Sequence, residues 1–69
     1  MTIGKLIRGA RKELSLSQAA LARAIGVSGK AIGVWERGES EPEDHNLCAA
    51  MEYLGIEWDE VIAVRKAAA

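Results

Sequence analysis

Apolar residues recur at helical spacing through most of the chain, and no stretch alternates with the period of two that strands require. In residues 2–14, cationic side chains separate the apolar ones, which is typical of an amphipathic helix. The apolar positions of this helix are Ile3, Leu6, Ile7, Ala10 and Leu14. The pattern therefore predicts a first helix over residues 2–14.

Two further short helices are predicted after the link at residues 15–16. Ser17 is a good N-cap for a helix that runs to about residue 25, and Ser28 is a good N-cap for one that runs to about residue 37. Gly26 supplies the left-handed residue that ends the first of these, and Gly38 ends the second.

Residues 38–44 are predicted to form a loop, because Pro42 moves the preceding residue away from helical angles. A fourth helix follows, with an apolar stripe made by Leu47, Ala50, Met51 and Leu54. We expect Asp44 to cap it, although Ser40 with Glu43 offers a capping box as an alternative. Gly55 closes this helix.

A short fifth helix is predicted to begin near Glu57 or Trp58. The chain therefore reads as an all-α, compact five-helix domain over residues 1–64, with a fraying C-terminal tail at residues 65–69. A core built from 69 residues contributes only about 3–5 kcal/mol of net stability. Dimerisation is a plausible source of further stability.

The few reactive side chains exclude several classes of site. Cys48 is the only cysteine and His45 the only histidine, so neither an internal disulfide nor a structural zinc site is expected. Cys48 is expected to be buried and His45 to be solvated. The single cysteine fits a reducing cytoplasm. The charged N-terminal stretch predicts neither a signal peptide nor a membrane span, which favours a soluble, intracellular protein.

The net charge of −1 hides two halves of opposite sign. Residues 1–38 carry seven lysines and arginines and two glutamates, so their net charge is +5. The net charge of residues 39–69 is −6. One half can therefore attract phosphate while the other repels it, unless the split is a chance imbalance on solvated helices. The acidic residues Glu39 and Glu41, which follow the third helix, should weaken an approach to phosphate.

The tract over residues 17–38, SQAALARAIGVSGKAIGVWERG, has apolar and small residues at the offsets of a helix-turn-helix. These residues are Leu21, Ala22, Ile25, Val27, Ile32 and Trp35. The tract resembles the Cro and phage-repressor branch of the helix-turn-helix proteins, which share the lambda-repressor-like fold. The resemblance extends over residues 3–62 through Arg11, Gln18, Glu36, Gly38 and Pro42. It implies that the partner is double-stranded DNA.

By this resemblance, the third helix lies in the major groove and its base-facing positions are Gly29, Lys30, Gly33 and Val34. Lys30 suits guanine, and Val34 suits a thymine methyl group. The two glycines either allow the backbone to approach the groove or make a mobile helix that orders on DNA. Relatives often carry polar residues at these positions, so DNA binding is better supported than direct sequence reading, and DNA shape can contribute.

The resemblance also implies contacts to the DNA backbone and a bracing ion pair. The expected phosphate-contacting residues are Ser17, Gln18, Ser28, Arg37 and Arg11. The ion pair joins Arg11 to Glu36 and is expected to be partly buried, so that Arg11 braces the third helix and still presents charge to phosphate.

The leading hypothesis is therefore a repressor-like transcriptional regulator that binds a short palindromic operator as a homodimer. Trp58, Val61 and Ile62 form a candidate dimer surface, with a monomeric core role for Trp58 as the alternative. The second hypothesis is an antitoxin-like or antirepressor module that binds a protein partner. No nucleophile with a base and no phosphate-cradling loop is present, so neither an enzyme nor a cofactor is expected.

Overall fold

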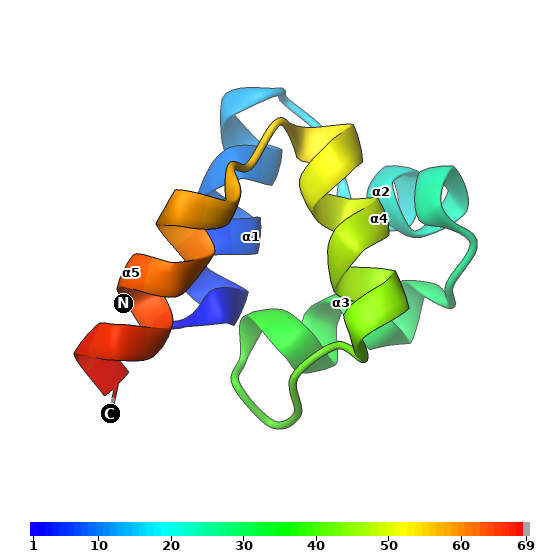
Figure 1. Cartoon of the computed structure of the whole chain (residues 1–69). Helices are drawn as coiled ribbons and strands as arrows, with labels where there is room; N and C mark the ends of the chain where they lie inside the picture. Colours follow the sequence, from blue (N-terminus) through cyan, green and yellow to red (C-terminus); the bar gives the residue numbers. More distant parts are fainter. Residues whose placement is uncertain (69) are drawn as a thin grey trace.

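The computed structural model describes residues 1–68, which form five helices joined by short turns. The helices are α1 (Ile3–Glu13), α2 (Gln18–Ile25), α3 (Gly29–Glu36), α4 (Asp44–Leu54) and α5 (Trp58–Ala68). No strand occurs in this part of the chain, so the predicted all-α, five-helix fold is confirmed. The first turn of α1 and the last turn of α5 lie on the same side of the molecule (Figure 1).

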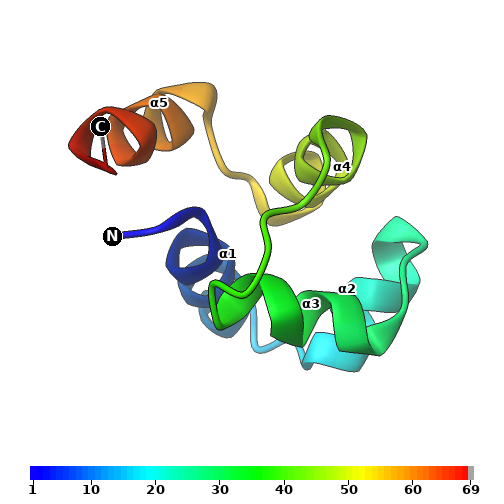
Figure 2. The same cartoon turned by 90° about the horizontal axis from the view of Figure 1, so that it is seen from below.

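Helix α1 is central to the arrangement, because it packs against α3, α4 and α5. Helix α2 packs against α3 and α4. Seen from below, α2 and α3 lie along one side of the molecule, and α4 and α5 lie on the other (Figure 2). The outer side of the α2–α3 pair is thus left without a covering helix.

Each helix contributes one side chain that is almost completely buried at the centre. These five residues are Ile7, Leu21, Ile32, Leu47 and Val61. Full burial of an aliphatic side chain of this size stabilises the fold by about 1.5–3 kcal/mol before the loss of conformational entropy is counted. The five helices therefore share one core.

The turns around α2 and α3 agree with the local signals. The Ser17 hydroxyl accepts a hydrogen bond from the Ala20 amide at 3.0 Å, and the Ser28 hydroxyl accepts one from the Ala31 amide at 3.2 Å. Gly26 has φ +78°, in the left-handed region that the helix end requires. Both predicted N-caps and the predicted turn are confirmed.

The expected start of α4 is wrong. Asp44 is the first residue of the helix rather than its cap, and the capping position falls on Glu43, whose side chain makes no capping hydrogen bond. As a first-turn carboxylate, Asp44 instead interacts favourably with the positive end of the helix dipole. Gly55 ends α4 at φ +75°, as predicted.

Helix α5 begins at Trp58 as expected but is longer than expected, because it continues through Ala68. Residues 65–68, which were expected to form a tail, belong to this helix, and Ala69 lies outside the described residues. The Glu60 carboxylate accepts a hydrogen bond from the Glu57 amide at 2.8 Å, which satisfies one of the free donors at the helix start.

Leu14 and Cys48 were expected among the residues that face the core, but both lie on the surface. Leu14 is 51% exposed, because α1 ends at Glu13 and the next residue leaves the helical stripe. Cys48 is also exposed, since it directly follows the buried Leu47 and so lies on the outer face of α4. The expectation that Cys48 is buried is wrong.

Candidate nucleic-acid interface

An ion pair with two hydrogen bonds joins α1 to α3. Arg11 donates from Nε to Glu36 Oε2 at 2.7 Å and from Nη2 to Glu36 Oε1 at 2.9 Å. Its Nη1 donates to the Leu16 carbonyl oxygen at 2.7 Å, in the link before α2. The two side chains are only 10% and 4% exposed. The expected buried ion pair is confirmed, and it fixes the end of α3 to the rest of the domain.

Gln18 extends this network from the start of α2. Its Nε2 donates to Glu36 Oε1 at 3.1 Å. Burial alone would raise the pKa of Glu36, but the hydrogen bonds from Arg11 and Gln18 hold that pKa below its ordinary value. Glu36 is therefore a carboxylate with partners on α1 and α2, and α3 is held in a defined orientation.

Arg11 was also expected to contact phosphate, and its side chain is largely buried. Its guanidinium has three donors engaged inside the protein, and its charge is matched by Glu36. An arginine in this position braces the helix but presents little charge to solvent. The bracing role of Arg11 is therefore confirmed, and its contact to phosphate stays a prediction.

The expected base-facing positions do not behave alike. Gly29 and Lys30 are exposed at the start of α3, and the space beside Gly29 is open. Val34 is half-buried and packs against the core. Gly33 is buried, because side chains from neighbouring positions cover it. Lys30 is thus the accessible hydrogen-bond donor among these four side chains.

The start of each of the two helices offers backbone amides as well as a serine cap. Each cap takes one amide, and the first two N–H groups of α2 and of α3 have no partner within their helices. Helix N-termini of this kind favour anions. Ser17, Gln18 and Ser28 therefore lie where phosphate contacts were expected.

Arg37, the remaining expected phosphate contact, is paired with an acidic residue of the following loop. Its Nε donates to Glu39 Oε2, and both side chains are more than half exposed. The hydrogen bond from Arg37 lowers the pKa of Glu39. Glu39, one of the acidic residues that were expected to repel phosphate, is thus paired with Arg37.

A profile of the helix-turn-helix family matches residues 7–61. The chain belongs to this family. The repressor protein C2 of Salmonella phage P22 is 48% identical over 52 residues, which are 75% of this chain and 24% of the phage protein. The HTH-type transcriptional regulator DicA of Escherichia coli K12 is 44% identical over 54 residues, which are 78% of this chain and 40% of DicA.

Solved structures give the same result for the fold of this helix-turn-helix domain. A crystal structure of the P22 c2 repressor in complex with synthetic operator 9T has a TM-score of 0.82 at 43% identity, covering 88% of this chain and 92% of that one. A nuclear magnetic resonance structure of the DNA-binding domain of the same repressor also has a TM-score of 0.82, at 42% identity, covering 90% of this chain and 82% of that one. The resemblance to the phage repressors is confirmed.

The helix-turn-helix chain spans less than half the length of the two curated relatives it matches. The shared part contains the whole helix-turn-helix, since α2 and α3 lie inside residues 7–61. The family assignment also supports the expectation that the chain is not an enzyme.

The candidate dimer surface on α5 is smaller than expected. Trp58 is 51% exposed and Ile62 is 45% exposed, and their spacing of four residues places them on one face of the helix. Val61 is only 1% exposed and belongs to the core, so its assignment to this surface is wrong. Helix α5, which carries this exposed pair, lies on the opposite side of the molecule from α3 (Figure 2).

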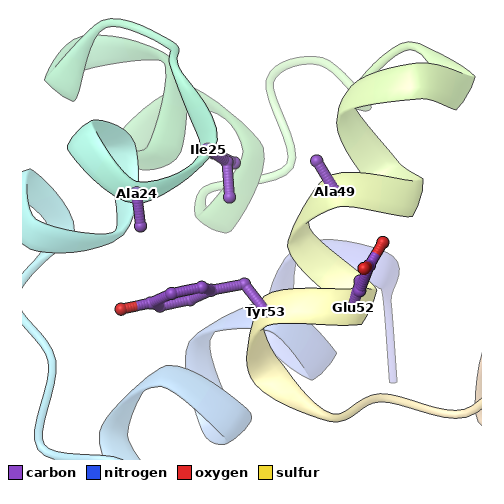
Figure 3. Close-up of a pocket in the computed structure, with 5 residues that line it drawn as sticks. All are labelled: Ala24, Ile25, Ala49, Glu52 and Tyr53. Atoms are coloured by element: carbon purple, nitrogen blue, oxygen red, sulfur yellow. The ribbon is translucent and has the colours of Figure 1, made fainter.

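A surface depression with a volume of about 440 Å³ lies between α2 and α4. Figure 3 shows the Tyr53 ring extending from α4 toward Ala24, with Ile25 and Ala49 facing the same space. Its lining includes one carboxylate, Glu52, and no basic or nucleophilic partner. Within residues 1–68, no cluster of histidine, cysteine or acidic side chains could hold a metal ion.

None of the helices that the structure describes is both long enough and apolar enough to cross a membrane.

Proposed function

We propose that this helix-turn-helix domain binds double-stranded DNA and acts as a transcriptional regulator of the repressor type, with α3 in the major groove. The observation that carries the proposal is the network of Arg11, Gln18 and Glu36, which holds α3 against α1 and α2 while the start of α3 stays exposed. A rigidly held helix with an open outer face is the arrangement that major-groove reading requires.

The two serine-capped helix starts support the same proposal. The free amides at the start of α2 bind one phosphate, with the Gln18 side chain beside them. The free amides at the start of α3 bind a second phosphate. Exposed cations of the N-terminal half add attraction to the duplex; they are Lys5, Arg8, Lys12, Arg23 and Lys30. The relatives agree, because one is named a repressor and another a transcriptional regulator.

The domain is proposed to bind a palindromic operator as a homodimer. Trp58 and Ile62 supply an exposed apolar face on α5 that a second copy can cover. A two-fold dimer places its two reading helices about 34 Å apart, which is one turn of the duplex.

The salt dependence of duplex binding tests the proposal. For a dimer that contacts about 6–10 phosphates, the affinity for duplex DNA should fall by about three decades or more between 50 and 200 mM salt. Selection of bound duplexes from a random pool, carried out at the lower salt concentration, would then give the half-site, its palindromy and its spacing together. Absence of duplex binding, or an affinity that does not respond to salt, would refute DNA as the partner.

The acidic half of the chain favours a second candidate, a protein-binding module of the antitoxin or antirepressor type. Residues 39–69 carry a charge of −6, and Trp58 lies exposed within them. Such a module would bind its partner through this half and would show no salt-dependent affinity for duplex.

A further inference from the structure

One face of α3 carries a stripe of two glycines followed by an arginine. Gly29, Gly33 and Arg37 are spaced by four residues, so they lie one above another on the same face of the helix. The space beside Gly29 is open to solvent. Arg37, at the C-terminal end of this stripe, has no neighbouring side chain on the stripe to displace it.

Gly33 is nevertheless buried, and Arg37 is what covers it. A Cβ on Gly33 would lie 2.9 Å from Arg37 Nη1 and 3.8 Å from Arg37 Cζ, with Gln18 Oε1 at 3.6 Å. Helical side chains lean toward the helix N-terminus, which brings the side chain of one residue over the residue four positions earlier. The Arg37 guanidinium thus occupies the place that a side chain at residue 33 would take.

The guanidinium is only partly engaged there. Its Nε donates to Glu39, whereas Nη1 and Nη2 donate no hydrogen bond to any residue in the described range 1–68. The side chain is 57% exposed. Since a guanidinium is planar, holding Nε fixes the plane and leaves the edge formed by the two Nη groups free to donate.

We propose that Arg37 is a base-reading residue: its guanidinium, lying over Gly33, supplies the paired donors that the glycine at this base-facing position lacks. This inference rests on the proposed DNA-binding function. Two parallel N–H donors match the O6 and N7 acceptors of guanine in the major groove, so the preferred base at this position is guanine. Glu39 is a positioning residue that holds the guanidinium plane.

A contact to phosphate alone predicts a different outcome, and Arg37→Lys separates the two. Lysine keeps the charge that a phosphate contact uses but loses the planar pair of donors. We expect the selected half-site to show guanine at one base pair for the wild-type chain. Discrimination against other bases there should fall at least about fivefold in Arg37→Lys.

Two glycine variants form a matched pair for the same measurement. Gly33→Ala places a Cβ against the flexible end of Arg37 and should displace the guanidinium, which reduces the guanine preference at that base pair. Gly9→Ala adds a Cβ on α1, away from the base-facing positions and where nothing lies within 4 Å, and it should leave that preference intact. Thermal unfolding of each variant would test whether the fold is retained.

Glu39→Gln tests the positioning role. Loss of its charge should raise affinity for duplex of random sequence, because a carboxylate beside phosphate repels it, while the guanine preference falls. An Arg37→Lys chain that binds with an unchanged half-site would overturn the base-reading role and leave DNA binding standing. Absence of duplex binding by the wild-type chain would overturn both proposals.

Discussion

Gly4 and Trp35 bring the backbones of α1 and α3 into direct contact. A Cβ on Gly4 would lie 1.9 Å from the Trp35 carbonyl oxygen and 3.1 Å from the Glu36 Cα. Backbone atoms cannot rotate out of the way as a side chain can, so any larger residue at position 4 must push the two helices apart. The contact includes the backbone of Glu36, whose carboxylate holds α3 in place.

We therefore predict that Gly4→Ala destabilises the domain by about 3 kcal/mol or more, at the upper end of the usual cost of overpacking. Gly9→Ala is the matched control on the same helix, because nothing lies within 4 Å of a Cβ there. That change should stabilise the domain by up to about 1 kcal/mol, through helix propensity alone. Urea unfolding of both variants measures the difference, and equal stabilities would contradict the close contact.

The ion pair between Arg11 and Glu36 gives a second prediction. Glu36→Ala leaves a buried guanidinium without its partner and should cost about 2–4 kcal/mol of unfolding free energy. The exposed Glu13 on α1 provides a control, since Glu13→Ala should change stability by less than about 0.5 kcal/mol. A loss below that limit for Glu36→Ala would show that the pair contributes nothing to the fold.

Acid should weaken the domain through the same carboxylate. The pKa of Glu36 in the folded chain lies below its ordinary value of 4.5, so its contribution is present in full above that value and is lost as the pH falls through the folded pKa. Glu36→Gln removes the titrating group. Unfolding free energies measured between about pH 6 and 3 should therefore fall more steeply for the wild-type chain than for this variant.

Adjacent residues of α5 should separate stability from assembly. Val61→Ala removes buried methyl groups and should cost about 1–3 kcal/mol. Ile62→Ala, one residue later on the exposed face, should leave the stability of the monomer nearly unchanged but weaken self-association. Sedimentation equilibrium beside thermal unfolding distinguishes these effects. A dimer unaffected by Ile62→Ala and Trp58→Ala would place its interface elsewhere.

Lys30 should contribute to both the strength and the sequence preference of duplex binding. Lys30→Ala is expected to reduce affinity and to alter the preferred base at one position of the half-site, since it removes the exposed donor at the start of α3. Lys66→Ala, which removes an equal charge from α5, is the control for a purely electrostatic effect. If the two variants lose affinity equally and keep the same half-site, Lys30 adds charge without reading a base.

Features governed by neighbouring residues could be predicted from the sequence. A serine hydroxyl reaches an amide three residues later in its own chain, and a left-handed glycine ends the helix before it. The caps at Ser17 and Ser28 and the turn at Gly26 are therefore found where the sequence places them. The link between Arg11 and Glu36 required the family resemblance, because 25 residues separate the two.

The errors arise where tertiary packing decides. Val61 and Ile62 are both apolar and adjacent, and only the direction in which α5 meets α1 determines which of them is buried. Cys48 is exposed for the same reason on α4. The contact at Gly4 could not be predicted from the neighbouring sequence. A glycine early in a helix gives the same sequence pattern whether its open side faces solvent or another backbone.

The open space beside Gly29 leaves room for a side chain at the start of α3. Nothing lies within 4 Å of a Cβ at position 29, so an alanine there would disturb none of the residues that anchor this helix, which are Ile32, Trp35 and Glu36. Replacing this glycine, whose φ is not positive, also stabilises the fold by about 0.4–1 kcal/mol, because it reduces the conformational entropy of the unfolded chain. Position 29 is thus one where a new DNA contact and a more stable helix come from the same substitution, which makes it the natural starting point for redesigning the half-site.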